Sequence, residues 1–178
     1  MMRKIMIWAA VIFFGLTAAS LGLYWGHYHW ALPFAITFGT CFYHFAMRLL
    51  VGTIINRKMG NQADYKKAWY QLRPFEFRMY RFLKVKKWKN GMPTYDPSSF
   101  DPKLHSWEEI VQAMCQAEIV HEVIIAMSFL PLLAAIPFGE FWVFLVTSLL
   151  ATMYDLSFVI MQRFNRPRIL KLLEKERA

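Results

Sequence analysis

The chain has 178 residues, of which 57% are hydrophobic, and its formal net charge is +9 at pH 7. Its mean hydropathy is +0.27, whereas soluble domains are nearer to half apolar and seldom so basic. This balance excludes an ordinary soluble globular protein. We therefore predict one all-α integral membrane domain, because helices satisfy their own backbone hydrogen bonds in lipid.

Four segments are long and apolar enough to cross the roughly 30 Å hydrocarbon core of a bilayer. They are residues 5–24, 31–55, 119–138 and 141–161. The first also has the basic start and small residues of a signal peptide, and we expect it to be retained as a helix.

The segment 62–105, between the second and third spans, interleaves aromatic residues with cations such as Lys87 beside Trp88. Its apolar residues recur at helical spacing, which predicts an amphipathic helix. Two interpretations stay open: a helix lying among anionic lipid headgroups, or a lip that binds an anionic part of a substrate. Ser106 and Glu109 form a capping-box pattern, so the third helix is expected to begin there.

The distribution of Lys and Arg predicts the topology, because cytoplasmic loops carry an excess of both. Residues 57–105 contain twelve and the tail after residue 161 contains six, whereas the links 26–30 and 136–140 contain none. We therefore predict a multi-pass protein of the bacterial cell membrane with both termini in the cytoplasm. A nucleic-acid partner is not expected, since the basic segment is tied to the bilayer on both sides.

Ionisable residues inside a span are costly and by default mark a function. At the cytoplasmic end of the third span lie Glu118, His121 and Glu122. Helical rise puts further polar residues of the other spans in the same inner-leaflet layer: His44, Arg48 and Asp155.

A histidine beside a carboxylate is a general base for activating a hydroxyl. We predict His121 as that base, oriented by Glu118, with His44 as the next candidate. Glu122, Arg48 and Asp155 are predicted to contact substrate. The alternative is that these charges only pair with one another, as buried charges must.

Metal chemistry is a competing interpretation, because Glu118-x-x-His121 has the spacing found on di-iron carboxylate helices. Such a site needs a second motif of this kind, and the sequence contains one only. No metal and no bound cofactor are therefore expected. No Ser or Cys is placed as a covalent nucleophile either, which favours direct transfer from an activated donor.

Three segments carry a resemblance: 85–89 (VKKWK), 117–121 (AEIVH) and 162–169 (QRFNRPRI). They are similar to the glycosyl-4,4'-diaponeurosporenoate acyltransferases of bacterial carotenoid synthesis, whose motif Q-R-Y-N-R-P-R-L resembles the third segment. The resemblance implies transfer of a fatty acyl group to a sugar hydroxyl of an amphiphilic lipid or carotenoid glycoside. The implied acyl donor is acyl-CoA or acyl-carrier-protein.

The basic motif after the fourth span completes the predicted site. As interface residues its cations would be ordinary, but a turn at Pro167 would bring them to the site mouth, where they would bind phosphate or carboxylate. The predicted substrate-binding residues of this motif are Arg163, Asn165, Arg166 and Arg168, and those of the segment 62–105 are Lys87 and Trp88. A non-enzymatic alternative is a small membrane subunit that packs against a larger lipid synthase or transporter.

Overall fold

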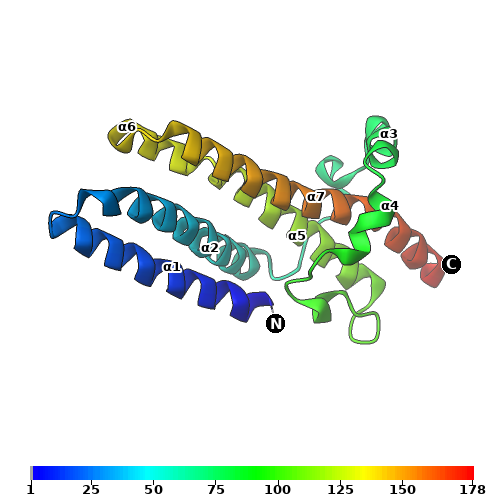
Figure 1. The fold of residues 1–178 in the computed structure, drawn as a ribbon. Coiled ribbons are helices and arrows are strands. Elements are labelled where there is room, and N and C mark those ends of the chain that lie inside the picture. The colour runs from blue at the N-terminus through cyan, green and yellow to red at the C-terminus, as the bar shows by residue number, and fades with distance from the viewer. Residues whose placement is uncertain (1) are drawn as a thin grey trace. The chain divides into compact units, whose positions relative to one another are not determined.

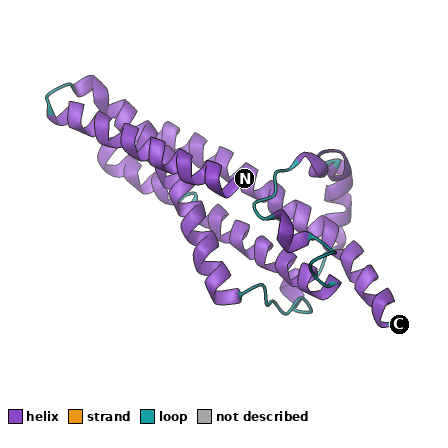
Figure 2. Ribbon diagram, turned by 90° about the horizontal axis from the view of Figure 1, so that it is seen from below, coloured by secondary structure: helices purple, strands orange, loops and turns teal. Residues whose placement is uncertain are grey.

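The computed structural model describes residues 2–178, and every regular element in that range is a helix (Figures 1 and 2). The α-helices are α1 (Met2–Trp25), α2 (Leu32–Met59), α3 (Pro74–Phe82), α4 (Val85–Trp88), α5 (Trp107–Met127), α6 (Ala135–Phe138) and α7 (Phe141–Arg177). Short 3₁₀ turns connect several of them. The all-α prediction is confirmed.

Four helical segments are long and apolar enough to cross a membrane, as predicted. They are Met2–Trp25, His29–Met59, Trp107–Phe138 and Phe141–Arg177. Large apolar side chains on α1 stay exposed, among them Trp8, Val11 and Phe14. A helix whose apolar side chains face outward in this way is suited to contact lipid rather than water.

The described chain divides into two compact units, each considered by itself. The first comprises residues 2–52 and 124–153. In it α1 and α2 form an antiparallel hairpin (Figure 1), in which Phe13 stacks on Phe45 with ring centroids 5.8 Å apart. The Tyr43 hydroxyl donates to the Met127 carbonyl over 2.8 Å and thereby ties α2 to the end of α5.

The third predicted span is helical but is not one continuous α-helix. After Met127 the chain forms the 3₁₀ turn Leu130–Ala134 and then the short α6. Pro131 explains the interruption, because proline lacks an amide hydrogen and its ring disfavours the α conformation of the preceding residue.

The second unit comprises residues 53–123 and 154–178 and holds two apolar clusters. In one, Val111 and Cys115 of α5 pack with Leu173 of α7; Cys115 is thus a packing residue. In the other, Tyr80 and Val85 pack with Ile160. These clusters hold the segment between α2 and α5 against α5 and the C-terminal part of α7.

The segment 62–105 contains two short α-helices, α3 and α4, where the sequence predicted one amphipathic helix. They are separated at Lys84, whose φ of 50° is in the left-handed region that ends an α-helix. The predicted capping box is confirmed: the Ser106 hydroxyl accepts from the Glu109 amide, the Glu109 carboxylate accepts from the Ser106 amide, and α5 begins at Trp107.

The predicted turn at Pro167 is wrong, because α7 continues through Pro167 to Arg177. Proline inside a helix costs about 3 kcal/mol or more. Packing around this position offsets that cost: Leu173 is buried, Ile169 and Leu170 pack beside it, and Arg166 is held by side-chain hydrogen bonds. Tertiary contacts therefore outweigh the local preference.

Candidate functional site

His121 of α5 lies beside Asp155 of α7, which was not its predicted partner. Nδ1 of His121 is 2.9 Å from Oδ1 of Asp155, and the Asp155 side chain is only 1% exposed. An ionised carboxylate only accepts hydrogen bonds, so we assign the hydrogen to Nδ1. Nε2, on the opposite side of the ring, is then the basic nitrogen.

The ring of His121 is also held in orientation by an aromatic neighbour. It stacks on Phe158, one turn from Asp155 on α7, with centroids 4.5 Å apart and an interplanar angle of 6°. The His121 side chain keeps 21% of its surface exposed. A histidine fixed through Nδ1 and accessible elsewhere has the arrangement that a general base requires.

Glu118 is bound to two arginines rather than to His121, so the predicted Glu118–His121 pair is wrong. Its carboxylate, which is fully buried, accepts from Arg163 over 2.5 Å and from Arg166. Arg166 also donates to the Tyr70 carbonyl over 2.8 Å, and its guanidinium lies over the Tyr70 ring. The expectation that Arg166 lies at the site mouth is likewise corrected, since its side chain is 2% exposed.

Arg163 connects Glu118 to the segment 62–105. It donates to both carboxylate oxygens of Glu76 over 2.9 and 2.6 Å, and to the carbonyls of Trp69 and Gln71. Burial raises the pKa of Glu76, but hydrogen bonds from Arg163 and Tyr80 lower it more, so the net pKa is below its usual value. Burial and the hydrogen bond to Glu76 raise the pKa of Tyr80. Glu76 is therefore a carboxylate, and Tyr80 a neutral donor.

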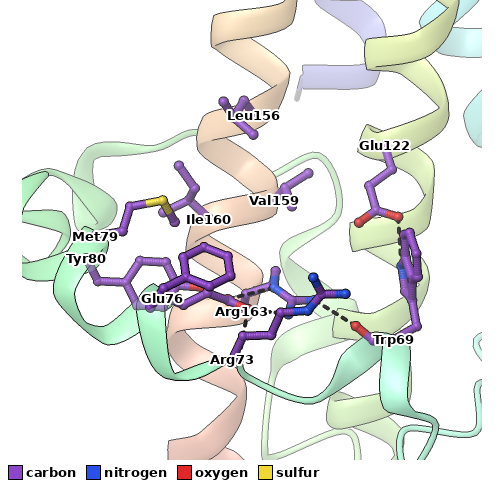
Figure 3. A pocket seen from close by; sticks show the side chains of 11 residues that line it. Trp69, Arg73, Glu76, Met79, Tyr80, Glu122, Leu156, Val159, Ile160 and Arg163 are labelled. Carbon is purple, nitrogen blue, oxygen red and sulfur yellow. Dashed lines mark hydrogen bonds and ion pairs between the residues drawn. The ribbon is translucent and has the colours of Figure 1, made fainter.

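Beside this network lies a pocket of about 250 Å³ (Figure 3). One wall is apolar and comes from α7: Leu156, Val159 and Ile160. The polar side includes Glu122, whose carboxylate accepts from the Trp69 indole over 3.0 Å. Glu122 and Leu156 follow His121 and Asp155 directly in the chain, but neither His121 nor Asp155 lines the pocket.

A second pocket, of about 660 Å³, lies between α3, α4 and α7; five basic residues help to line it, and most of its surface is apolar. Of the predicted binding residues it includes Lys87 and Arg168. Asn165 instead accepts from Lys89 over 2.8 Å, and the Trp88 indole donates to the Leu83 carbonyl. The basic segment thus forms a concave site rather than only a surface.

His44 and Arg48 belong to the first unit, whereas the residues described above belong to the second. His44 is buried on α2, and Arg48 donates to the carbonyls of His44 and Ala151 over 3.0 and 3.5 Å. These contacts do not test the predicted catalytic role of His44 or the predicted substrate-binding role of Arg48, so both remain predictions.

Sequence reasoning missed Glu76, which organises Arg163 and Tyr80. A signal was present, since Glu76 is the one acidic residue between Asp64 and Asp96 in a strongly basic stretch. A lone carboxylate among many cations is expected to be paired.

The metal alternative receives no support from the geometry. Among residues 2–178, no group of three or more His, Cys, Asp and Glu side chains is arranged to hold a metal ion. The two members of the proposed motif also point to different partners, Glu118 to arginines and His121 to Asp155.

Comparison with known protein families gave a match. The family described as glycosyl-4,4'-diaponeurosporenoate acyltransferase matches residues 66–175, more than half of the chain. The matched range includes both pockets, the histidine–aspartate pair and the Glu118 network. No curated protein and no solved structure matches the chain.

Proposed function

The chain belongs to the glycosyl-4,4'-diaponeurosporenoate acyltransferase family, and we propose that it transfers a fatty acyl group to a hydroxyl of a glycosylated lipid or carotenoid at the cytoplasmic leaflet. The observation that carries the catalytic part of this proposal is the His121–Asp155 pair. It joins a buried carboxylate to a partly accessible imidazole.

In the proposed reaction the acceptor hydroxyl attacks the carbonyl carbon of an acyl thioester directly. The hydroxyl proton passes to Nε2 of His121 as the C–O bond forms. Asp155 accepts a hydrogen bond from the Nδ1–H group throughout and stabilises the imidazolium by its negative charge. The C–S bond then breaks, and the departing thiolate takes the proton back from Nε2. No covalent enzyme intermediate is needed.

The acceptor sugar is proposed to bind in the first pocket. Its volume of about 250 Å³ is small for a ligand pocket, for which roughly 300–1,000 Å³ is typical, and suits one sugar ring rather than a whole lipid. Trp69 offers an aromatic surface and Glu122 a carboxylate for sugar hydroxyls. The apolar side chains of α7 would contact the lipid chain of the acceptor, which extends from the pocket toward the bilayer.

The competing proposal, a non-catalytic membrane subunit, is favoured by one observation. Glu118 is bonded to Arg163 and Arg166 within the helices, as expected of a purely structural charge. The subunit hypothesis assigns no role, however, to a stacked and partly exposed histidine beside a buried aspartate.

Acyl transfer by the purified protein tests the enzymatic proposal. Protein reconstituted in nanodiscs is supplied with a long-chain acyl-CoA and glycosyl-4,4'-diaponeurosporenoate, and the products are analysed by mass spectrometry. The expected product is the acceptor carrying one ester-linked acyl group. Because the sugar could belong to another glycolipid, a parallel lipid extract from a deletion strain should reveal which acylated glycolipid is lost. Absence of any ester in both experiments would favour the subunit.

The proposed position of the site at the cytoplasmic leaflet predicts the membrane topology, which can be tested separately. In a background with Cys41 and Cys115 replaced by alanine, single cysteines are placed at Lys86 in α4 and at Tyr28 between α1 and α2. In intact cells a membrane-impermeant maleimide should label the cysteine at position 28 and should label position 86 only after permeabilisation. The physical reason is the excess of Lys and Arg around position 86. The opposite labelling pattern would place the proposed site on the outer face.

A further inference from the structure

The second pocket concentrates positive charge without a compensating carboxylate. Five cations line it: Arg81, Lys84, Lys86, Lys87 and Arg168. No acidic residue among residues 2–178 contributes to its lining. Like charges gathered in a concave site repel one another, and a multivalent anion relieves that repulsion.

Lys89 lies beside this pocket without lining it. Burial, and secondarily the charge of Arg168, lowers the pKa of Lys89. Lys89 and Arg168 lie over the same Phe164 ring, 5.7 and 5.0 Å from its centroid. Two cations that share one aromatic ring are favourably placed to meet an anion at its edge.

The pocket also has flat apolar surfaces beside its charges. Phe77, Phe164 and Pro167 contribute them, and Phe77 remains 55% exposed. An aromatic ring next to several cations is the combination that accepts a nucleotide, whose base stacks while its phosphates bind Lys and Arg.

Packing contacts hold α3, α4 and α7 in place around the pocket. Tyr80 packs edge-on against Phe164 with centroids 5.6 Å apart, and Val85 is fully buried beside Tyr80. The Lys89–Asn165 hydrogen bond further joins the end of α4 to α7. A pre-formed site of this kind loses little entropy when it binds.

We propose that this basic pocket binds the phosphate groups of a nucleotide carried by the acyl donor, so that the donor is a nucleotide-linked acyl thioester of the coenzyme A class. The inference rests on the proposed function. A concave volume of about 660 Å³ suits a small molecule, for which roughly 300–1,000 Å³ is usual; an acidic carrier protein would need a broader surface.

The distance between Arg168 and Asp155 along α7 agrees with a donor in which a long chain separates the phosphates from the thioester. Arg168 and Asp155 are on one continuous helix, and a rise of about 1.5 Å per residue puts them about 20 Å apart. The two pockets share Tyr80 as a lining residue. A donor of this length could therefore have its phosphates at Arg168 and its thioester near His121.

Two measurements on the full-length protein in nanodiscs test the inference. The first is binding of adenosine 3',5'-bisphosphate, measured by calorimetry, to the parent protein and to Arg81→Gln, Lys87→Gln and the double variant. The matched control is Arg78→Gln, a change of the same kind on α3 outside the pocket. Each pocket variant should weaken binding about tenfold or more, since it removes a charge-assisted contact, and the control should bind as the parent does.

The second measurement compares acyl-CoA with the matching acyl-pantetheine, which has the same thioester but no phosphate. The pocket variants should raise KM for acyl-CoA about tenfold and leave kcat and the kinetics with acyl-pantetheine unchanged. Equal losses with both donors, or bisphosphate binding that the variants do not weaken, would overturn the inference. If neither donor is used but the bisphosphate binds as expected, the proposed function fails and the pocket assignment survives as a nucleotide site.

Lipid headgroups also carry phosphate, so both measurements are repeated in zwitterionic and anionic nanodiscs. The inference expects the same loss in both lipids. A loss confined to anionic nanodiscs would assign the pocket to lipid headgroups and overturn the donor assignment.

Discussion

Replacement of His121 with alanine is expected to lower the rate of acyl transfer by about 10²- to 10⁴-fold, the usual contribution of a positioned general base. The protein should still fold and insert, because His121 is at the edge of the packed region with 21% of its side chain exposed. The measurement is kcat in nanodiscs, normalised to the monodisperse protein recovered on size-exclusion chromatography. The matched control is His105→Ala, which alters a histidine in the loop before α5.

Asp155→Asn separates a catalytic from a structural role for this pair. Asparagine keeps the shape but has an amide that disfavours the Nδ1-protonated form of His121, and the corresponding change in a serine-protease triad lowers kcat by about 10⁴-fold. The rate should therefore fall sharply with the acceptor KM little changed. A folded His121→Ala variant with near-parental transfer would exclude His121 as the base and leave His44 as the next candidate.

Loss of the Glu118 charge is expected to destabilise the protein rather than to slow the chemistry. In Glu118→Gln the buried guanidinium of Arg166 loses its counter-charge, and Arg163 retains only that of Glu76. Removing one member of a buried ion pair costs about 3–5 kcal/mol. Denaturant unfolding in detergent should show a loss of this order, while the fraction that remains folded keeps most of its kcat.

Glu122→Gln is the matched control for this experiment, because it makes the same change on the same helix. The glutamine can still accept the hydrogen bond from Trp69, so little stability should be lost. If Glu118→Gln unfolds like the parent but loses activity in its folded state, the carboxylate acts in the reaction and the original pairing with His121 regains support.

The residues that the sequence singled out in the matched region all belong to the second unit, but their partners differ from the predicted ones. Glu118 and His121 are one turn apart on α5, and local spacing alone made them a pair. In the folded chain Glu118 instead meets Arg163 and Arg166, whereas His121 meets Asp155. Helical periodicity states which residues share a face, but not which neighbouring helix that face meets.

Elements whose stability is local were predictable from sequence. The apolar lengths predicted four helices that could span a membrane, and the Ser106–Glu109 capping box predicted the start of α5. Elements decided by distant contacts were not predictable. The continuation of α7 through Pro167 depends on burial of Leu173 against α5, and local propensity contains no information about that packing.

By itself, then, the sequence determined an all-helical fold with four membrane-length segments, and the family. Hydrophobic length, charge bias and short motifs are properties of adjacent residues, so they can be read along the chain. Only the tertiary structure decided that Asp155 orients His121, that Glu76 and Glu118 neutralise Arg163, and that the basic segment closes into a pocket with Arg168. The physical reason is that these ion pairs join residues 34 to 87 positions apart, whose proximity arises only when the helices pack.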